Sequence, residues 1–379
     1  MSKGLVLAGG GALGAYEIGA YEALQELGYS FDIVTGTSIG ALNGAFIASN
    51  MFNELKSLWN NMNPTDVVAD GQIIVANKIS DVLNSDNKKV IKSYVKNKMS
   101  LDNTPLKEYM AKAFNFEKFY NCKTRLGVVT TAFPRMKEVD VYVKEVKPNL
   151  VIPYLFASSA CVPIFPYEVI EGKKYIDGFF VDNLPIKLCF DMGATEIIAI
   201  DMRLFSLKPH HPFLINLPNV RYIAPYISLG SMIDFSQETI QRNKELGYLD
   251  VKKSFKILRG YYYCFENDFI INNFLSKIIK RYDTKVKIIL SELSDGIRDL
   301  MDEEDYIYRT IEIIFEELGI KSYYKIFRKE EVIKVIRREL TNIDMIPFKN
   351  PNRIRKKNIF NKYLYDFLNE YILTEDKIE

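Results

Sequence analysis

The feature that most constrains this chain is a serine held between two glycines directly after an apolar run. Residues 31–34 are apolar apart from one aspartate, and Gly36-Thr37-Ser38-Ile39-Gly40 follows before small residues begin a helical pattern. This order is typical of a nucleophile elbow, a strained strand-to-helix turn that exposes a serine hydroxyl. Gly36 and Gly40 suit the turn because strand and helix fold back closely and leave no space for a Cβ. The helix directs its N-terminal N–H groups at Ser38, which favours negative charge there.

A second glycine-rich stretch, Gly9-Gly10-Gly11-Ala12-Leu13-Gly14, follows an apolar run at residues 3–8 and precedes a helical pattern at residues 15–24. A strand, this loop, a helix and the strand of the elbow predict a right-handed crossover between parallel strands. The loop also fits a dinucleotide fingerprint, but that interpretation expects a carboxylate at the end of the second strand, where the chain has none. The alternative is an oxyanion hole, in which bare backbone N–H groups face a developing negative charge.

Composition argues against several kinds of site. A net charge of +2 over 379 residues gives no electrostatic preference for nucleic acid. The four cysteines lack metal-ligand spacing, which predicts reduced, buried thiols. The only histidines, His210 and His211, lie between prolines in an irregular linker, so neither a histidine metal site nor a Ser-His-Asp triad is expected. If Ser38 is a nucleophile, its base is therefore expected to be a carboxylate.

Three carboxylates are candidates for that base. Asp177 ends an apolar hairpin arm beside a glycine and two phenylalanines. Partial desolvation there would raise the pKa of the carboxyl group and make it a better base. Asp182 and Asp201 remain alternatives. Two further Asp-Gly pairs, at Asp70 and Asp295, are interpreted as a loop and a surface turn.

Together these segments resemble the patatin-like phospholipase family. The glycine loop, the elbow and Asp177-Gly178 ahead of Asp182-Asn183-Leu184-Pro185 occur in the family's order, and residues 101–106 and 157–166 also look like family segments. The resemblance covers about residues 4–205. It implies an α/β fold, a three-layer α/β/α sandwich with a mainly parallel central sheet.

The resemblance also implies a Ser-Asp dyad, with Ser38 as nucleophile and Asp177 as proton acceptor. Members cleave acyl esters of phospholipids, lysophospholipids or other lipids through an acyl-serine intermediate, without calcium or another cofactor. The remaining site residues fall into three groups by carry-over. These are the oxyanion loop Gly9, Gly10, Gly11, Ala12, Leu13 and Gly14 with the N–H of Ile39, the elbow residues Gly36, Thr37 and Gly40, and the aspartate-motif residues Gly178 and Phe179.

Two positions depart from the family pattern. Leu13 stands where Arg or Lys is usual, and Phe179 stands where Gly or Ala is usual, which predicts a loop without its cation and a narrower pocket. The leading hypothesis is a phospholipid or lysophospholipid acyl hydrolase. Two alternatives are a carboxylesterase for neutral lipids and a weakly active lipid-binding or regulatory module.

We expect two domains, a patatin-like α/β hydrolase domain at residues 1–255 and a mostly helical region of unknown role at residues 256–379. Helical patterns occur at 308–318 and 330–340, and residues 349–362 form a basic run with interleaved apolar residues. This run is interpreted as a solvated segment, with contact to an anionic membrane surface as the alternative. No signal peptide or membrane span is recognised, so a cytoplasmic protein, peripheral to a membrane at most, is expected.

Overall fold

The computed structural model describes residues 1–69, 100–203, 211–267 and 319–340, together with six residues between 308 and 316. The chain divides into two compact units, Met1–Val251 and Lys252–Glu379. The division expected from the sequence near residue 255 remains a prediction. Asp70, His210, Asp295 and the basic run 349–362 lie outside the described residues.

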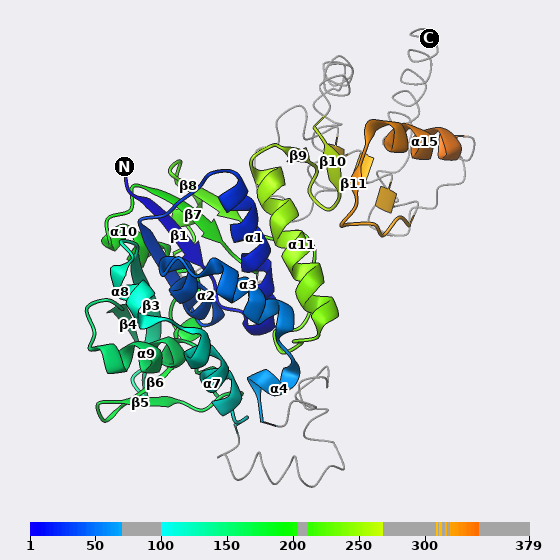
Figure 1. Cartoon of the computed structure of the whole chain (residues 1–379). Coiled ribbons are helices and arrows are strands. Elements are labelled where there is room, and N and C mark those ends of the chain that lie inside the picture. Colours follow the sequence, from blue (N-terminus) through cyan, green and yellow to red (C-terminus); the bar gives the residue numbers. More distant parts are fainter. Residues whose placement is uncertain are drawn as a thin grey trace, which may run out of the picture. The chain divides into compact units, whose positions relative to one another are not determined.

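A mixed eight-stranded sheet forms the centre of the first unit (Figure 1). Seven strands follow the order β5-β6-β3-β2-β1-β7-β8, and β4 pairs with β3. Of these, β1, β2 and the hairpin arm β6 were expected from the sequence. The strands are β1 (Lys3–Leu7), β2 (Ile33–Thr37), β3 (Arg125–Phe133), β4 (Lys137–Tyr142), β5 (Glu168–Ile170), β6 (Lys173–Asp177), β7 (Glu196–Ile200) and β8 (Val220–Ile223).

Five adjacent strands, β3, β2, β1, β7 and β8, run parallel, whereas β4, β5 and β6 join by antiparallel pairing. The predicted parallel pairing of the first two strands is confirmed, because β1 and β2 pair in parallel from Gly4 with Ile33 to Leu7 with Gly36. The carboxyl ends of the parallel strands therefore meet at one edge, where open α/β sheets place their ligands.

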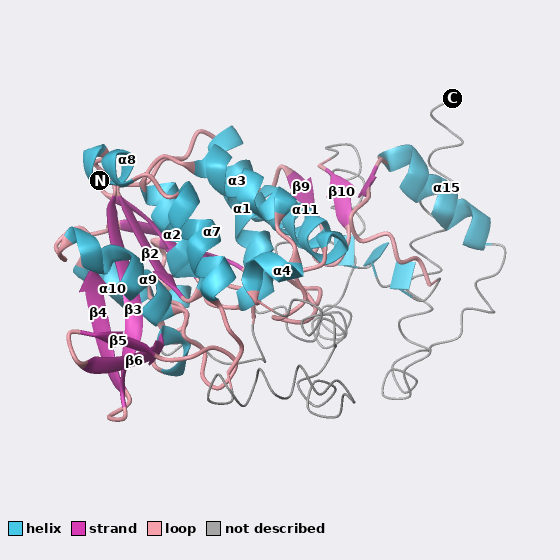
Figure 2. Ribbon diagram, turned by 60° about the horizontal axis from the view of Figure 1, so that its bottom comes forward, coloured by secondary structure: helices cyan, strands magenta, loops and turns pink. Residues whose placement is uncertain are grey.

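Helices cover both faces of this sheet and make the three layers (Figures 1 and 2). On one face, α2 lies so close that a Cβ on its Gly44 would touch Val34 and Leu126. On the other face, Leu188 and Met192 pack over Gly127 of β3. The helices of this unit are α1 (Ala15–Glu26), α2 (Ile39–Ala48), α3 (Phe52–Asn61), α4 (Pro64–Val67), α7 (Thr104–Ala113), α8 (Phe116–Asn121), α9 (Val151–Ser158), α10 (Ile186–Asp191) and α11 (Gln237–Ser254).

The sandwich expected from the sequence, with a mainly parallel core, is thus confirmed. None of the helices in the described ranges is long and apolar enough to cross a membrane.

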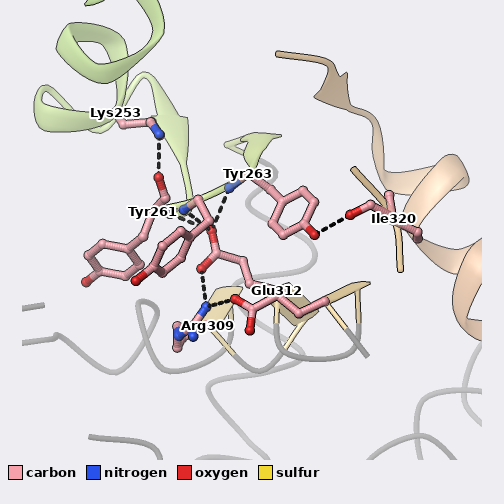
Figure 3. Close-up of polar contacts among 8 residues, drawn as sticks. Lys253, Tyr261, Tyr263, Arg309, Glu312 and Ile320 are labelled. Atoms are coloured by element: carbon pink, nitrogen blue, oxygen red, sulfur yellow. Dashed lines mark hydrogen bonds and ion pairs between the residues drawn. The ribbon is translucent and has the colours of Figure 1, made fainter. Parts of the chain in front are cut away.

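The second unit contains a three-stranded sheet that the sequence did not lead us to expect. It comprises β9 (Leu258–Arg259), β10 (Cys264–Glu266) and β11 (Ile326–Phe327), and it is followed by α15 (Lys329–Leu340), which confirms the helical pattern at 330–340. One oxygen of Glu312 accepts hydrogen bonds from the consecutive backbone N–H groups of residues 261–263, at 2.6, 2.8 and 3.0 Å (Figure 3). Its other oxygen binds Arg309, at 3.1 Å.

Two glycines allow α1 and α11 to pack backbone against backbone. A Cβ on Gly19 would lie 1.7 Å from the carbonyl oxygen of Lys244, and one on Gly247 would lie 1.9 Å from that of Tyr16. Neither obstacle is a flexible side chain, so an added methyl group would force the two helices apart.

We therefore predict that Gly247→Ala lowers the free energy of unfolding by about 1–3 kcal/mol, the usual cost of overpacking. Glu245→Ala, an exposed position on the same helix, is the matched control and should change stability little. Thermal unfolding of the full chain measures both, and equal melting temperatures for the two variants would contradict the close-packing argument.

Candidate active site

Ser38 lies at the reversal between β2 and α2, with a backbone conformation that L-residues rarely adopt. Its φ is 56° and its ψ is −124°, and the residue is buried. A Cβ on Gly36 would lie 2.3 Å from the carbonyl oxygen of Gly40, and one on Gly40 would lie 2.5 Å from that of Leu7. The close approach expected from the sequence is therefore present, and it forces the serine into its strained conformation.

The sheet register brings Asp177 to this serine. Along one side of β3, Thr37 of β2 pairs with Val129, and Asp177 of β6 pairs with the next residue, Thr130. Because β6 runs antiparallel to β3, the strands β2 and β6 meet end to end. The Ser38 hydroxyl donates a hydrogen bond to Oδ2 of Asp177 at 2.7 Å.

Asp177 is almost entirely removed from solvent, with 1% of its surface exposed. Burial raises the pKa of its carboxyl group to about 7, although hydrogen bonds from the Phe179 N–H and the Ser38 hydroxyl act in the opposite direction. The Phe179 N–H donates to Oδ1 at 2.8 Å, so each carboxylate oxygen has one donor. A carboxyl group poised near neutrality can both take up and release a proton at physiological pH.

The alternative carboxylates lie elsewhere. Oδ1 of Asp182 accepts a hydrogen bond from the N–H of Leu184, and burial raises the pKa of Asp182 to about 7 as well. Asp201 accepts the Tyr222 hydroxyl at 2.6 Å. Within the described part of the chain, Asp177 alone among the three carboxylates is hydrogen-bonded to Ser38.

Ser158 holds the nucleophile's backbone in place, a role that the sequence did not reveal. Its hydroxyl accepts the Ser38 N–H at 2.9 Å and donates to the carbonyl oxygen of Val129 at 2.7 Å. The backbone N–H of Ser38 thus has a hydrogen-bond acceptor in a buried position that water does not reach. The family segment at 157–160 contained this residue, but only the fold assigns it a contact.

The glycine loop lies beside Ser38, with several of its amides already engaged. The Gly9 N–H donates to both Oδ1 and the carbonyl oxygen of Asn183, at 3.1 and 3.2 Å. The Ala12 N–H donates to the carbonyl oxygen of Met232 at 2.8 Å. Among the described residues, the N–H groups of Gly10 and Gly11 have no acceptor. The structure thus differs from the expectation for Ala12, whose amide is not available to a ligand in this conformation.

The end of the loop is fastened by a buried polar network. Nδ2 of Asn43 donates to the carbonyl oxygen of Gly14 at 3.2 Å and to Oε2 of Glu17 at 2.8 Å, and its Oδ1 accepts the indole N–H of Trp59 at 3.0 Å. Burial raises the pKa of Glu17 well above its ordinary value. Leu13, the departure from the family pattern, is buried. Apolar packing therefore takes the place of a cation here.

Ser38 and Gly11 open into a pocket of about 630 Å³, part of it open to solvent. Its walls come from six parts of the chain and are almost wholly apolar. We expected Phe179 to narrow the pocket. That expectation is wrong for this pocket, because Phe179 is not among its lining residues. The lining residues are Gly11, Ser38, Ile39, Leu42, Val67, Leu101, Asn103, Leu106, Ser159, Cys161, Ile164, Phe165, Met232, Ile233 and Phe235.

The other predicted site residues support the elbow and the aspartate turn. The Thr37 hydroxyl donates to the carbonyl oxygen of Asp182 at 2.8 Å. Gly178 passes so close to β3 that a Cβ would lie 2.2 Å from the carbonyl oxygen of Val129. Ile39 begins α2, so its N–H points out of the first turn beside Ser38. Residues 1–69, 100–203 and 211–267 bring together no cluster of three or more His, Cys, Asp or Glu side chains suited to a metal ion.

A three-layer α/β sandwich with a serine on a strand-to-helix elbow, hydrogen-bonded to a buried aspartate, defines the class of this protein. Residues 5–190 match the family described as patatin-like phospholipase. The first unit therefore carries a patatin-like phospholipase domain, as the sequence motifs indicated.

Curated relatives share this domain. Lysophospholipase NTE1 of Mycosarcoma maydis is 28% identical over 214 residues, which is 53% of this chain and 10% of the relative. The patatin-like phospholipase domain-containing protein ZK370.4 of Caenorhabditis elegans is 44% identical over 204 residues, 52% of this chain and 13% of the relative. The chain thus spans only about a tenth of the length of these relatives.

Among solved structures, VipD from Legionella pneumophila is similar over 97% of this chain and 87% of its own, with 15% identity and a TM-score of 0.44.

The burial of Asp177 predicts a pH-dependent stability. Because its folded-state pKa lies near 7, above the ordinary value of about 4, its contribution to stability is fully present at low pH and is lost as the pH rises through about 7. The side chain of Asp177→Asn does not titrate. The difference in melting temperature, variant minus wild type, should therefore rise between about pH 4 and pH 7 and stay constant above pH 7. Asp182 titrates in both proteins, so its contribution cancels in this difference. A difference in melting temperature that does not vary with pH would contradict the claim that burial raises the pKa of Asp177.

Proposed function

We propose that this chain is a lipid acyl hydrolase that cleaves acyl esters of phospholipids or lysophospholipids through an acyl-serine intermediate on a Ser-Asp dyad. The hydrogen bond of 2.7 Å between Oγ of Ser38, which lines an apolar pocket, and Oδ2 of Asp177 is the observation that carries the proposal. The names of the curated relatives, lysophospholipases and a patatin-like phospholipase domain-containing protein, support the substrate class.

In the first half-reaction the Ser38 oxygen attacks the ester carbonyl carbon while Asp177 takes the hydroxyl proton. The carbonyl oxygen becomes an oxyanion, for which the N–H groups of Gly10 and Gly11, with that of Ile39, are the available donors. Collapse of this intermediate breaks the bond to the alcohol, which leaves with the proton from Asp177, and the acyl group remains on Ser38.

In the second half-reaction water attacks the acyl-serine carbonyl carbon, and Asp177 accepts a proton from that water. Cleavage of the acyl bond returns the proton to Oγ of Ser38 and releases the carboxylic acid. One carboxyl group thus serves as base and as acid in turn, which a pKa near 7 permits.

The pocket suits an acyl chain because apolar side chains such as Leu42, Leu106 and Phe235 line it beside the nucleophile. Nothing in this lining selects a headgroup. A carboxylesterase for neutral lipids and a weakly active lipid-binding module are therefore the outcomes that the experiments below distinguish.

Labelling with a fluorophosphonate, followed by mapping of the adduct, tests the nucleophile directly. We expect the adduct on Ser38. We expect Asp177→Asn to lose about 10²–10⁴-fold in kcat/KM on p-nitrophenyl esters, the usual contribution of a general base, and Ser38→Ala to lose at least as much. Asp182→Asn and Asp201→Asn are the matched controls and should retain most activity. Full activity in Asp177→Asn would refute the dyad.

The substrate class is tested by mass spectrometry of the acyl chains released from defined lipids. Release from lysophospholipid or phospholipid supports the proposal, whereas release from acylglycerols alone supports the carboxylesterase. Since the proposed steps need no metal, activity should persist in excess chelator, and a loss that calcium restores would contradict calcium independence.

The pH profile follows from the same carboxyl group. Asp177 acts as base only when ionised, so kcat/KM should rise with pH through an apparent pKa of about 7 and reach a plateau above it. Initial rates on a neutral short-chain ester measure this profile, with Asp182→Asn as the control for the second carboxyl group of similar pKa. An inflection near pH 4, the ordinary value for a carboxyl group, would show that the base is solvated.

A further inference from the structure

Two β-hairpins extend past the edge of the sheet where the dyad lies. Strand β3 pairs with β2 only as far as Val129, and its remaining residues up to Phe133 pair with β6 instead. The turn into β4 and the β5–β6 hairpin therefore project beyond the carboxyl end of β2. In Figure 1, β5 and β6 lie at the end of the sheet opposite to the N-terminus.

This projection carries large apolar side chains in an exposed position. Phe133 of β3 and Val169 of β5 both pair with Lys174 of β6, so the three side chains share one face of the sheet across adjacent strands. Phe133 is 43% exposed and Val169 is 58% exposed, and Met136, in the β3–β4 turn, is 45% exposed. We call Phe133, Met136 and Val169 the hairpin patch.

The charges around the hairpin patch are predominantly positive. Arg135, Lys137, Lys173 and Lys174 are exposed, and residues 133–137 and 172–176 contain no acid. Three acids flank these segments, Glu138, Glu168 and Glu171. Glu168 forms an ion pair with Lys107, and Glu171 forms one with Lys147 at 3.0 Å.

Exposed apolar groups among an excess of cations are the combination that an anionic lipid surface binds, because the apolar groups enter the interface while the cations meet the headgroups. We propose that the hairpin patch and its four basic residues dock this protein on anionic bilayers. The proposal rests on the proposed function, since a hydrolase of membrane lipids has to receive its substrate from a bilayer.

The location of the hairpin patch supports this role. Phe133 lies three residues along β3 from Thr130, the partner of Asp177, which at about 3.3 Å per residue corresponds to about 10 Å. The Lys107–Glu168 ion pair ties β5 to α7, and the adjacent residue, Leu106, lines the apolar pocket. A bilayer bound at the hairpins would therefore lie next to a wall of the pocket.

Vesicle sedimentation tests the proposal, with the full chain in its Ser38→Ala form so that no lipid is consumed. Phosphatidylcholine vesicles with and without phosphatidylserine, at low and high salt, are the probes. We expect binding that needs phosphatidylserine and weakens with salt. The double variant Phe133→Ser/Val169→Ser should lose at least about tenfold in partitioning, and Lys173→Gln and Lys174→Gln should each lose about fivefold.

Matched controls come from the opposite edge of the sheet. Phe213 is 64% exposed and precedes the amino end of β8, and Lys123 is exposed and precedes the amino end of β3. The variants Phe213→Ser and Lys123→Gln should bind vesicles as well as the wild type does. In the catalytically intact chain, the hairpin-patch variant should hydrolyse a dissolved p-nitrophenyl ester as the wild type does but should lose activity on vesicles.

Three results would overturn the proposal. The first is that the wild type does not bind vesicles, and the second is that the hairpin-patch variant binds them as well as the wild type does. The third is that the wild type is a dimer and the hairpin-patch variant is a monomer, which would assign the surface to a second copy of the chain. Failure of the proposed function is separate, because it appears as absent hydrolysis of the dissolved ester while vesicle binding persists.

Discussion

The site depends on one constraint, the tight reversal at Ser38. A serine with φ of 56° is stable only where the surrounding structure holds it in that conformation. Here the strand and the helix approach so closely that no residue larger than glycine fits at positions 36 and 40. The hydrogen bond from its N–H to Ser158 fixes the same turn from the other side. The direction of the hydroxyl is therefore set by the backbone before any partner is considered, and the register of β6 on β3 supplies that partner.

Burial gives the pair its chemical character. In water the Asp177 carboxylate would be a weak base, whereas desolvation raises its pKa to about 7 while two hydrogen bonds keep its ionised form accessible. Desolvation of this kind disfavours the folded state when the group is charged. The same environment that would make Asp177 an effective base therefore opposes folding at neutral pH, a compromise common at functional sites.

The sequence predicted the parts of the site that depend on local chain geometry. The elbow, the glycine loop and the desolvated Asp177 each have a signature within a few residues, and the structure brings all three together. Ser158, Asn183 and Met232 could not be found in this way, because their contacts to residues 38, 9 and 12 depend on how distant segments pack. The small sheet of the second unit has strands of two or three residues, too short to show an alternating pattern.

The hydrogen bond between the Ala12 N–H and the Met232 carbonyl oxygen has a consequence for biosynthesis. The glycine loop and Ser38 leave the ribosome before the segment that braces the loop and lines the pocket, which lies about two hundred residues further along the chain. Because domains generally fold as units once their chain has emerged, the nascent chain would hold an unfinished site while the residues between these two segments are translated. The active site would therefore be completed only after α11 has been released to pack on α1.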